Sequence, residues 1–292
     1  MIANFVIAHY RPMIHQITRP HPSLQLFVKE YLIVHFDFKG YAQIPAKIFP
    51  PRPDTSIIFY PSQTFKKINT LINKQIDMPN SVVQGQQLTN WHHHYQQQFT
   101  CVKIVFQPGG LYHLLGKLPM TDLLDQAVDA QMVLGREVNE ILQRLMDSQQ
   151  YPEMIRVIED YLMKKYHKIK LTVEPIDKIG SLFTQPNAYQ SLDFLAHESC
   201  LSIRQFERKF KDRVGISPKL FTRLVRFNYA FGMKDENPTQ DWLTIALNCG
   251  YTDYQHMVKD FKQFAGLTPT LLMKENDTSP DKLLGMNKVV VF

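Results

Sequence analysis

The chain has 292 residues, of which 44% are hydrophobic, and it carries a formal net charge of +6. This length suits two domains rather than one small core, and the apolar content is ample to bury both. The apolar runs are short or interrupted by charge, and the N-terminus shows no basic start before an apolar core, so we expect a cytoplasmic protein without a membrane span. Cys101, Cys200 and Cys249 lie far apart and fit no disulfide or metal motif, which predicts reduced thiols.

Residues 31–106 are expected to form a β-rich domain. Short runs rich in β-branched and aromatic residues (31–36, 56–60, 81–83 and 101–106) alternate with turn-forming clusters, which predicts a barrel or sandwich. Beyond Pro108 the spacing becomes helical, and two amphipathic helices are predicted over 137–146 and 152–166. Strands followed by helices indicate an α+β class with segregated layers.

A polar, basic linker is expected at 167–171, and an all-helical domain follows it. Helices are predicted over 173–183, 192–198, 202–213, 218–234, 242–247, 254–264 and 269–274. The tail contains a stretch typical of disorder, 277–281, and ends in apolar residues 289–292. We therefore divide the chain into a β-rich domain with helices (1–167), an all-helical domain (168–276) and a C-terminal tail (277–292).

Positive charge is concentrated in the helical domain. Residues 202–226 contain eight basic side chains against the acids Glu207 and Asp212, an excess equal to that of the whole chain. The basic residues are Arg204, Arg208, Lys209, Lys211, Arg213, Lys219, Arg223 and Arg226. Such a stripe is expected of a protein that binds the phosphate backbone of nucleic acid, although a solvated helix face would give the same pattern.

An internal repeat aligns 202–218 with 253–269 without gaps, at an offset of 51 residues. The identical pairs are Phe210 and Phe261, Lys211 and Lys262, Gly215 and Gly266, and Pro218 and Pro269. Each copy follows a short apolar helix and a tight turn, with Cys200 and Cys249 expected in equivalent turns. That placement leaves open a redox switch, although a free cysteine is more often inert and buried.

Each copy has a helix-turn-helix layout, whose second helix enters the major groove of DNA. That helix opens at a capping residue, Ser202 or Asp253, whose side-chain oxygen can accept a bond from the backbone. In the first copy Ile203, Phe206 and Phe210 share one face, which is expected to pack, and the polar face is free to read bases. A helical hairpin that never touches nucleic acid is the alternative, but it does not require the arginines of the polar face.

Residues 173–275 resemble the DNA-binding domain of the AraC/XylS family of transcription regulators. The resemblance covers about a third of the chain and rests on Ser202-x-Arg-x-Phe-x-Arg-x-Phe-Lys, Gly215-Ile-Ser-Pro218, Arg226 followed by Ala230, Ile245-Ala-x-x-x-Gly250-Tyr and Gly266-Leu-Thr-Pro269. It implies two helix-turn-helix subdomains joined by one long helix, here 218–234. The N-terminal half resembles, less specifically, the β-barrel domains of such regulators at Phe106-x-Pro-Gly-Gly-Leu111, which implies a cupin-like barrel with covering helices.

The resemblance places base-reading residues on both recognition helices. They are Arg204, Glu207 and Arg208 in the first helix and Tyr254, Gln255 and Lys259 in the second. Arginine can pair with guanine, glutamine with adenine and glutamate with cytosine. Phosphate contacts are expected from Ser202, Lys211, Arg213, Lys219 and Lys262 and from the N-termini of the recognition helices.

The second unit departs from the family pattern in two ways. Met257-Val258 replaces the aromatic-led pair usual there, and 241–275 contains three basic residues against four acidic ones. We therefore expect the first unit to supply most of the affinity for DNA. Two insertions on one face of the duplex would lie one helical turn, about 34 Å, apart.

The run from Trp91 through His92, His93 and His94 to Tyr95 invites a metal site, because imidazole is a common ligand. Neighbouring strand residues point to opposite faces, so only His92 and His94 could share an ion, and no third ligand is evident. We predict neither metal nor cofactor. The resemblance implies an effector pocket, and the candidate lining residues, which are otherwise plain core aromatics, are Phe36, Phe59, Tyr60 and Trp91.

The leading hypothesis is a bacterial, non-catalytic regulator that binds double-stranded DNA. The resemblance implies RNA polymerase as a partner and leaves open an effector and a homodimer formed through helices in 137–166. One alternative is a metal-dependent barrel enzyme, which an ion lost on changing His92 and His94 would favour; no catalytic motif supports it. The other is an interaction module, which unchanged nucleic-acid binding after Arg204→Ala and Arg208→Ala would favour.

Overall fold

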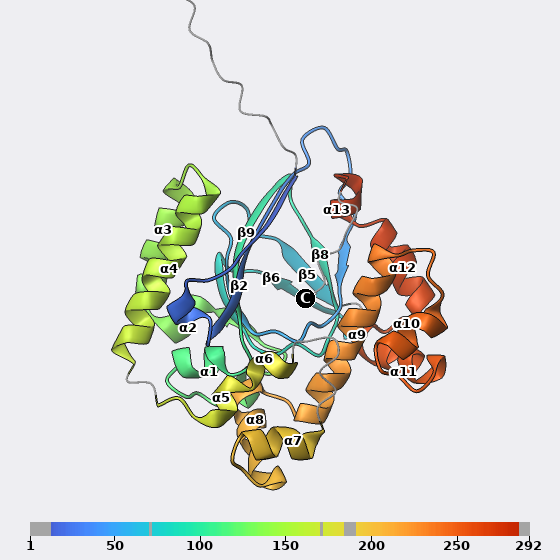
Figure 1. Cartoon of the computed structure of the whole chain (residues 1–292). Coiled ribbons are helices and arrows are strands. Elements are labelled where there is room, and N and C mark those ends of the chain that lie inside the picture. Colours follow the sequence, from blue (N-terminus) through green and yellow to red (C-terminus); the bar gives the residue numbers. More distant parts are fainter. Residues whose placement is uncertain (1–12, 70–71, 170–171, 184–190, 286–292) are drawn as a thin grey trace, which may run out of the picture.

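Two antiparallel sheets form the N-terminal part of the chain (Figure 1). The computed structural model describes residues 13–69, 72–169, 172–183 and 191–285. The six-stranded sheet has the order β1 (Met13–Thr18), β2 (Val28–Asp37), β9 (Gln98–Phe106), β4 (Ser56–Phe59), β7 (Ser81–Gln84) and β10 (Ala127–Asp129). The four-stranded sheet has the order β3 (Lys47–Phe49), β8 (Trp91–His94), β5 (Lys66–Asn69) and β6 (Lys74–Asp77). The sheet-rich domain is confirmed, but the pairings among these described strands form two sheets and not one closed barrel.

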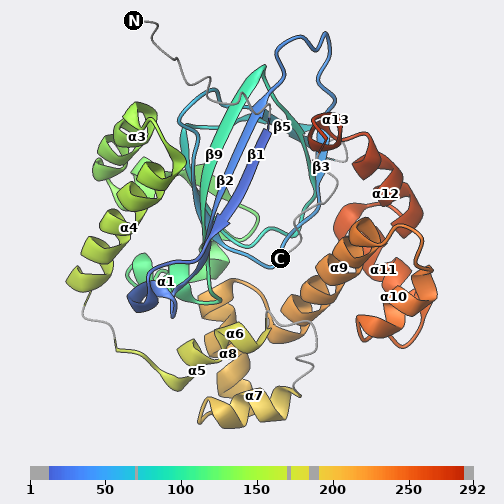
Figure 2. The same cartoon turned by 45° about the horizontal axis from the view of Figure 1, so that its top comes forward.

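Helices cover one face of the larger sheet. They are α1 (Gly110–Leu114), α2 (Ala130–Leu134), α3 (Glu137–Asp147) and α4 (Tyr151–Lys168), with short 3₁₀ helices η1 (Pro22–Leu24) and η2 (Met120–Leu123) beside them. The predicted amphipathic faces of α3 and α4 supply Ile141, Leu145 and Ile158 to a core shared with Ile57 and other strand residues. Figure 2 shows α3 and α4 on one side of the strands and α10 to α12 on the other.

Alternation along the strands gives the larger sheet two different faces. In β4, Ile57 and Phe59 point into the helix-covered core, and Ile58 points the opposite way. Tyr60, the next residue, joins the apolar cluster of Ile58 on that second face. Residues of the smaller sheet lie across from this cluster and enclose a cavity with it.

The C-terminal part is helical, as predicted. Its helices are α5 (Pro175–Lys178), α6 (Gly180–Phe183), α7 (Leu192–Glu198), α8 (Ile203–Val214), α9 (Pro218–Glu236), α10 (Trp242–Asn248), α11 (Tyr254–Ala265), α12 (Pro269–Asp277) and α13 (Pro280–Leu283). The helix predicted over 173–183 is two short helices. One core gathers around Phe206, Phe210 and Phe221, and another gathers around Phe227 and Phe261. Helix α9 contributes to both cores. None of the described helices is long and apolar enough to cross a membrane.

The predicted caps form at both ends of α8 and α11. Ser202 Oγ accepts from Gln205 N at the start of α8, and Asp253 accepts from His256 N at the start of α11. Gly215 and Gly266 end the two helices with left-handed φ angles of +95° and +71°. Only glycine adopts this conformation without a steric penalty, so the repeat fixes where each recognition helix stops.

The turns before the recognition helices correct the expected cysteine equivalence. Helix α7 is capped by Ser191 and Ser199, whereas α10 is capped by Asp241 and Cys249. Cys249 therefore corresponds to Ser199, and Cys200 corresponds to Gly250. Cys249 is buried, which raises the pKa of its thiol to about 12, whereas Cys200 is exposed. The two thiols thus occupy different positions and environments, which removes the basis for pairing them as a switch.

We predict that Cys200→Gly stabilises the protein. Cys200 has a left-handed φ of +54°, and Gly250, its counterpart, has +72°. A left-handed L-residue costs roughly 1 to 2 kcal/mol, partly offset by the greater unfolded-state entropy of glycine, so the free energy of unfolding should rise by up to about 1 kcal/mol. Denaturant unfolding measures this, with Cys200→Ala as the unchanged control. A glycine variant no more stable than the alanine variant would show that the turn carries no strain.

The C-terminal tail is more ordered than the sequence predicts. The disorder expected over 277–281 is wrong, because these residues end α12 and begin α13. The Asp281 side chain is 1% exposed and lies 2.6 Å from Lys47 Nζ, and Lys282 Nζ lies 2.9 Å from Asp235 Oδ1. These ion pairs fasten the segment to β3 and α9. The apolar end, 289–292, and linker residues 170–171 lie outside the described residues.

Candidate nucleic-acid interface and ligand cavity

Helix α8 separates polar and apolar residues as predicted. Its exposed polar residues include Arg204, Glu207, Arg208 and Lys211. Phe206 and Phe210 are 0% and 3% exposed and pack in the core of the first helix-turn-helix unit. Ile203 departs from the predicted apolar face, since it lies in the first turn and is 42% exposed. The base-reading candidates of this helix therefore lie together on an accessible surface.

Half of the basic stripe is engaged within the protein. Lys209 pairs with Glu174, and Arg223 lies 2.6 Å from Asp260. Arg226 donates to the Gly250 carbonyl at 3.1 Å, and Arg213 is buried among acids. The phosphate candidates that remain exposed are Ser202, Lys211, Lys219 and Lys262. The expected phosphate contact from Arg213 is not supported, because its guanidinium is already paired and its side chain is only 6% exposed.

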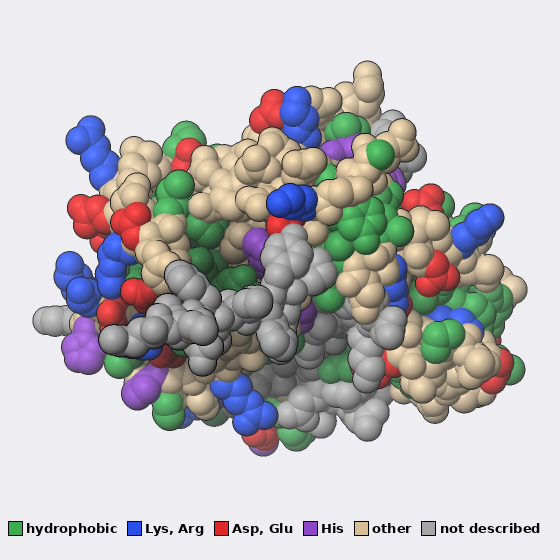
Figure 3. All heavy atoms as spheres, turned by 90° about the horizontal axis from the view of Figure 1, so that it is seen from above, with side chains coloured by type: hydrophobic (Ala, Val, Ile, Leu, Met, Phe, Trp, Pro, Cys, Tyr) green, Lys and Arg blue, Asp and Glu red, His purple; other side chains and the backbone are tan. Residues whose placement is uncertain are grey.

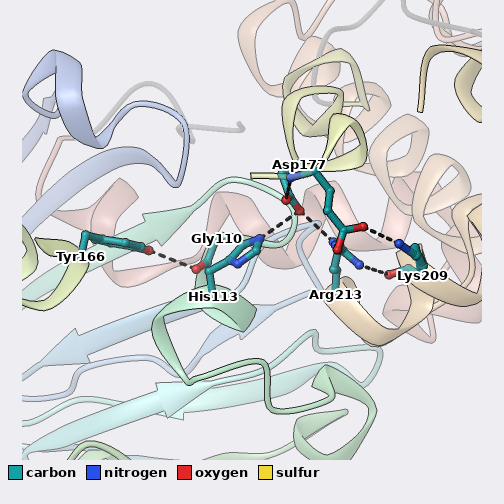
Figure 4. Close-up of polar contacts among 7 residues, drawn as sticks. Gly110, His113, Tyr166, Asp177, Lys209 and Arg213 are labelled. Carbon is teal, nitrogen blue, oxygen red and sulfur yellow. Dashed lines mark hydrogen bonds and ion pairs between the residues drawn. The ribbon is translucent and has the colours of Figure 1, made fainter. Parts of the chain in front are cut away.

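Arg213 belongs to a cluster, called here the Asp177 cluster, made of the buried His113, Asp177 and Arg213, which Figure 4 labels, and the half-buried Glu174. Arg213 Nε donates to Asp177 Oδ1 at 2.8 Å, and its Nη2 lies 3.2 Å from Glu174 Oε1. His113 Nε2 from α1 lies 2.9 Å from the same Asp177 oxygen. Burial alone would raise the pKa of Asp177, but His113 and Arg213 outweigh it and lower that pKa to about 2. The cluster thus connects α8 to α1 of the N-terminal domain.

The N-terminal domain contacts the carboxyl ends of both α8 and α11. A Cβ at Gly215, which ends α8, would lie 2.9 Å from the Met120 carbonyl oxygen. At the other unit, Asn90 donates to the carbonyl of Ala265, the last residue of α11. Leu88 packs against the cores of both units. The segment between β7 and β8 therefore touches both candidate DNA-reading units.

Helix α11 presents a weaker version of the same surface. Gln255 and Lys259 are exposed, whereas Tyr254 is half-buried and packs against the core of the second unit. Met257 is fully buried in that core, so the departure from the family pattern serves packing.

On the end of the molecule shown in Figure 3, opposite α8 in Figure 1, basic and acidic side chains are interspersed. Among the described side chains visible there, the basic ones do not form a continuous patch.

A cavity of about 160 Å³ lies between the two sheets. Phe36, Tyr60 and Trp91 line it as expected, but Phe59 points into the helix-covered core instead. The sequence reasoning missed its charged lining, which includes Lys47, Arg52, Asp54, Lys67, Lys103 and Asp281. Strand alternation was the available signal for Phe59, because neighbours on a strand cannot face the same cavity.

The histidine run does not assemble a metal centre. In the described part of the chain, no three His, Cys, Asp or Glu side chains are grouped so that they could hold an ion. His92 lies 3.8 Å from Glu275, whereas His93 faces the cavity and stacks on Phe49 with ring centroids 4.0 Å apart. His93 therefore lines the cavity, whereas His92 does not.

The comparisons with known proteins identify the class of the C-terminal domain. A model described as a helix-turn-helix domain matches residues 195–275, and one described as a domain of unknown function (DUF6597) matches 16–129. A search of curated proteins finds no match. With the duplicated unit, its caps and the helix-turn-helix match, the protein is a DNA-binding transcription regulator. The helix-turn-helix match falls within residues 173–275, the part of the chain that resembles the AraC/XylS family.

The comparison with solved structures gives several matches of low sequence identity. ToxT from Vibrio cholerae is 11% identical, with 84% of this chain and 97% of that chain covered and a TM-score of 0.43. ToxT from Vibrio cholerae with bound unsaturated fatty acid is 11% identical, with 83% of this chain and 95% of that chain covered and a TM-score of 0.45. An AraC-type regulator from Chromobacterium violaceum is 22% identical over 34% of this chain and 87% of that chain, with a TM-score of 0.30. We draw no conclusion from these likenesses, because every TM-score is below 0.5.

Proposed function

We propose that the protein is a sequence-specific regulator that inserts α8 and α11 into successive major grooves of double-stranded DNA. The observation that carries this proposal is the exposure of Arg204, Glu207 and Arg208 beside the buried Phe206 and Phe210. Arg204 and Arg208 would pair with guanine and Glu207 with cytosine. Exposed polar residues on a helix that follows a tight turn are what major-groove readout requires.

The second helix has a supporting role in this proposal. Tyr254, Gln255 and Lys259 would read bases from α11, with Lys262 on a phosphate. Lys211, Lys219 and the capped N-terminus of α8 at Ser202 would hold the backbone at the first unit. Because Tyr254 is half-buried and acidic residues outnumber basic ones from 241 to 275, α8 would supply most of the affinity.

The N-terminal domain would bind an effector. This domain would run from 1 to 167, the DNA-binding domain from 168 to 276, and the tail from 277 to 292. The cavity offers apolar walls and a few charged groups, which is the make-up of small-molecule sites. RNA polymerase would be the protein partner of the DNA-bound regulator, and α3 and α4 would offer a surface for a homodimer.

The test of DNA binding is the salt dependence of Lys211→Ala. Lys211 is exposed on α8, so its ammonium would neutralise a phosphate and release a counterion. The variant should bind the natural promoter and scrambled DNA more weakly by a similar factor, and its slope of log K against log salt should fall by about 1. Fluorescence anisotropy with both duplexes at several salt concentrations measures this.

Glu198→Gln is the control, because Glu198 ends α7 and has no assigned role at the DNA. Equal binding of promoter and scrambled DNA by the wild-type protein at every salt concentration would contradict the proposal of a sequence-specific regulator. An unchanged slope in Lys211→Ala would remove Lys211 from the phosphate contacts while leaving the rest of the interface in place.

A further inference from the structure

Three basic side chains form a row across the smaller sheet. Lys47 of β3 pairs in register with His93 of β8, and Lys67 of β5 pairs with the same His93. Register partners in an antiparallel sheet point to the same face, and all three residues line the cavity. The two lysines flank His93 on the same wall of the cavity, so their like charges repel each other and an anion between them would offset this repulsion. A negative charge inside the cavity would therefore be stabilised beside this row.

An acidic side chain pairs with the lysine at one end of the row but not with the lysine at the other end. Lys47 Nζ lies 2.6 Å from Asp281 Oδ2. Lys67 is 4% exposed, has no acidic side chain paired with it among the described residues, and places its Nζ 4.5 Å from the centre of the Trp91 ring. Burial lowers the pKa of Lys67 to about 8 and holds that of His93 well below its ordinary value. Lys67 thus carries a charge near neutral pH with the Coulombic attraction of Asp125 but with no carboxylate in an ion pair with it among the described residues.

Asp281 reaches the cavity from the far end of the chain. Its side chain is 1% exposed, and its Oδ2 lies 2.6 Å from Lys47 Nζ. Its helix, α13, is also held by the ion pair of Lys282 with Asp235 of α9, and Leu284 packs against the apolar cluster beside the cavity. The segment Ser279 to Leu284 therefore connects the cavity wall with the helix that joins the two DNA-reading units.

We propose that the row Lys47, His93 and Lys67 binds the acid group of a small organic anion, and that this anion competes with the Asp281 carboxylate for Lys47. The proposal rests on the effector cavity proposed above and names its ligand class and regulation. An anion between the lysines would balance Lys67 and remove the need for Asp281 at Lys47. The apolar body of the ligand would lie among Phe36, Tyr60 and Trp91.

Cavity size limits the ligand. About 160 Å³ is close to the roughly 150 Å³ that holds a benzene ring in a dry apolar cavity, so benzoate is a suitable probe and benzyl alcohol its uncharged counterpart. Departure of Asp281 would free α13 from β3 and leave α9 without one of its anchors to the N-terminal domain. Ligand binding would in this way alter how the two recognition helices are held.

The experiment measures benzoate binding by calorimetry with the full chain. Wild type should bind benzoate at least about tenfold more tightly than benzyl alcohol, and Asp281→Asn should bind benzoate about tenfold more tightly than wild type, because the internal competitor is gone. Lys67→Gln should lose about tenfold or more, whereas Lys66→Gln, which changes the exposed neighbour on the opposite face, should match wild type. Circular dichroism establishes that each variant is folded.

Hydrogen exchange on wild type supplies the second readout. Benzoate should speed amide exchange in 280–285 and slow it in β5 and β8. Equal benzoate affinity in wild type and Asp281→Asn, with unchanged exchange in 280–285, would overturn the competition. Benzoate binding no tighter than benzyl alcohol would overturn the anion site. Promoter binding by the same samples distinguishes either failure from failure of the regulator assignment, which predicts DNA binding whatever the ligand.

Discussion

Arg213→Ala is expected to lower the free energy of unfolding by about 3 to 5 kcal/mol, the cost of removing one partner from a buried ion pair. The Arg213 and Asp177 side chains are 6% and 3% exposed, so solvent screens their interaction little. The variant leaves the Asp177 carboxylate buried with His113 as its remaining paired side chain. It also removes the guanidinium that lies 5.2 Å from the Tyr112 ring. Denaturant unfolding followed by circular dichroism measures the loss.

Lys211→Ala provides the matched control, because Lys211 lies two residues earlier on the same helix and is exposed. It should change stability by less than about 0.5 kcal/mol. If Arg213→Ala instead retained full stability and flattened the salt dependence of DNA binding, Arg213 would be a phosphate contact after all. The ion pairs of Arg213 in the Asp177 cluster would then be absent when the protein is bound to DNA.

The pH dependence of stability gives a second readout of the same cluster. The pKa of Asp177 is about 2 in the folded protein and 3.8 in its ordinary state. A lowered folded pKa means that its stabilisation is complete above the ordinary pKa and is lost as pH falls through the folded one. Wild type should therefore lose this contribution between about pH 4 and pH 2. Arg213→Ala should lose less over that window, because one of the partners that lower the pKa is absent.

Local sequence patterns predicted the parts of the fold that depend on neighbouring residues. Apolar spacing predicted α3, α4 and the recognition helices, and Gly215 and Gly266 marked where α8 and α11 end. The gap-free repeat predicted two similar units because each unit folds around its own core. Signals confined to one or two helical turns suffice for such features.

Contacts between distant segments could not be predicted in this way. Asp281 lies in a stretch typical of disorder, and its order comes from Lys47, which is 234 residues away. Arg213 was placed on DNA because its charge was visible and its partners, Glu174 and Asp177, were not recognisable as such. The row of Lys47 and Lys67 on either side of His93 depends on strand register, which single-strand patterns do not specify.

Arg208→Ala should weaken promoter binding by about 1 to 3 kcal/mol, or roughly tenfold to a hundredfold, and relax the preference at one base position. Arg208 lies on the exposed face of α8, opposite the buried Phe206 and Phe210, so truncation removes a base contact and leaves the core intact. Binding to scrambled DNA should change less, because most of that affinity comes from phosphate contacts. Competition with promoter duplexes substituted at single positions measures both effects.

Lys259→Ala on α11 is the matched comparison, because Lys259 follows the N-cap of α11 by six residues, as Arg208 follows that of α8. Its effect should be smaller, since Tyr254 is half-buried and the second unit carries less positive charge. A larger loss for Lys259→Ala than for Arg208→Ala would reverse the order of the two units. Equal losses on promoter and scrambled DNA would show that Arg208 contacts phosphate, because only a base contact makes the loss depend on sequence.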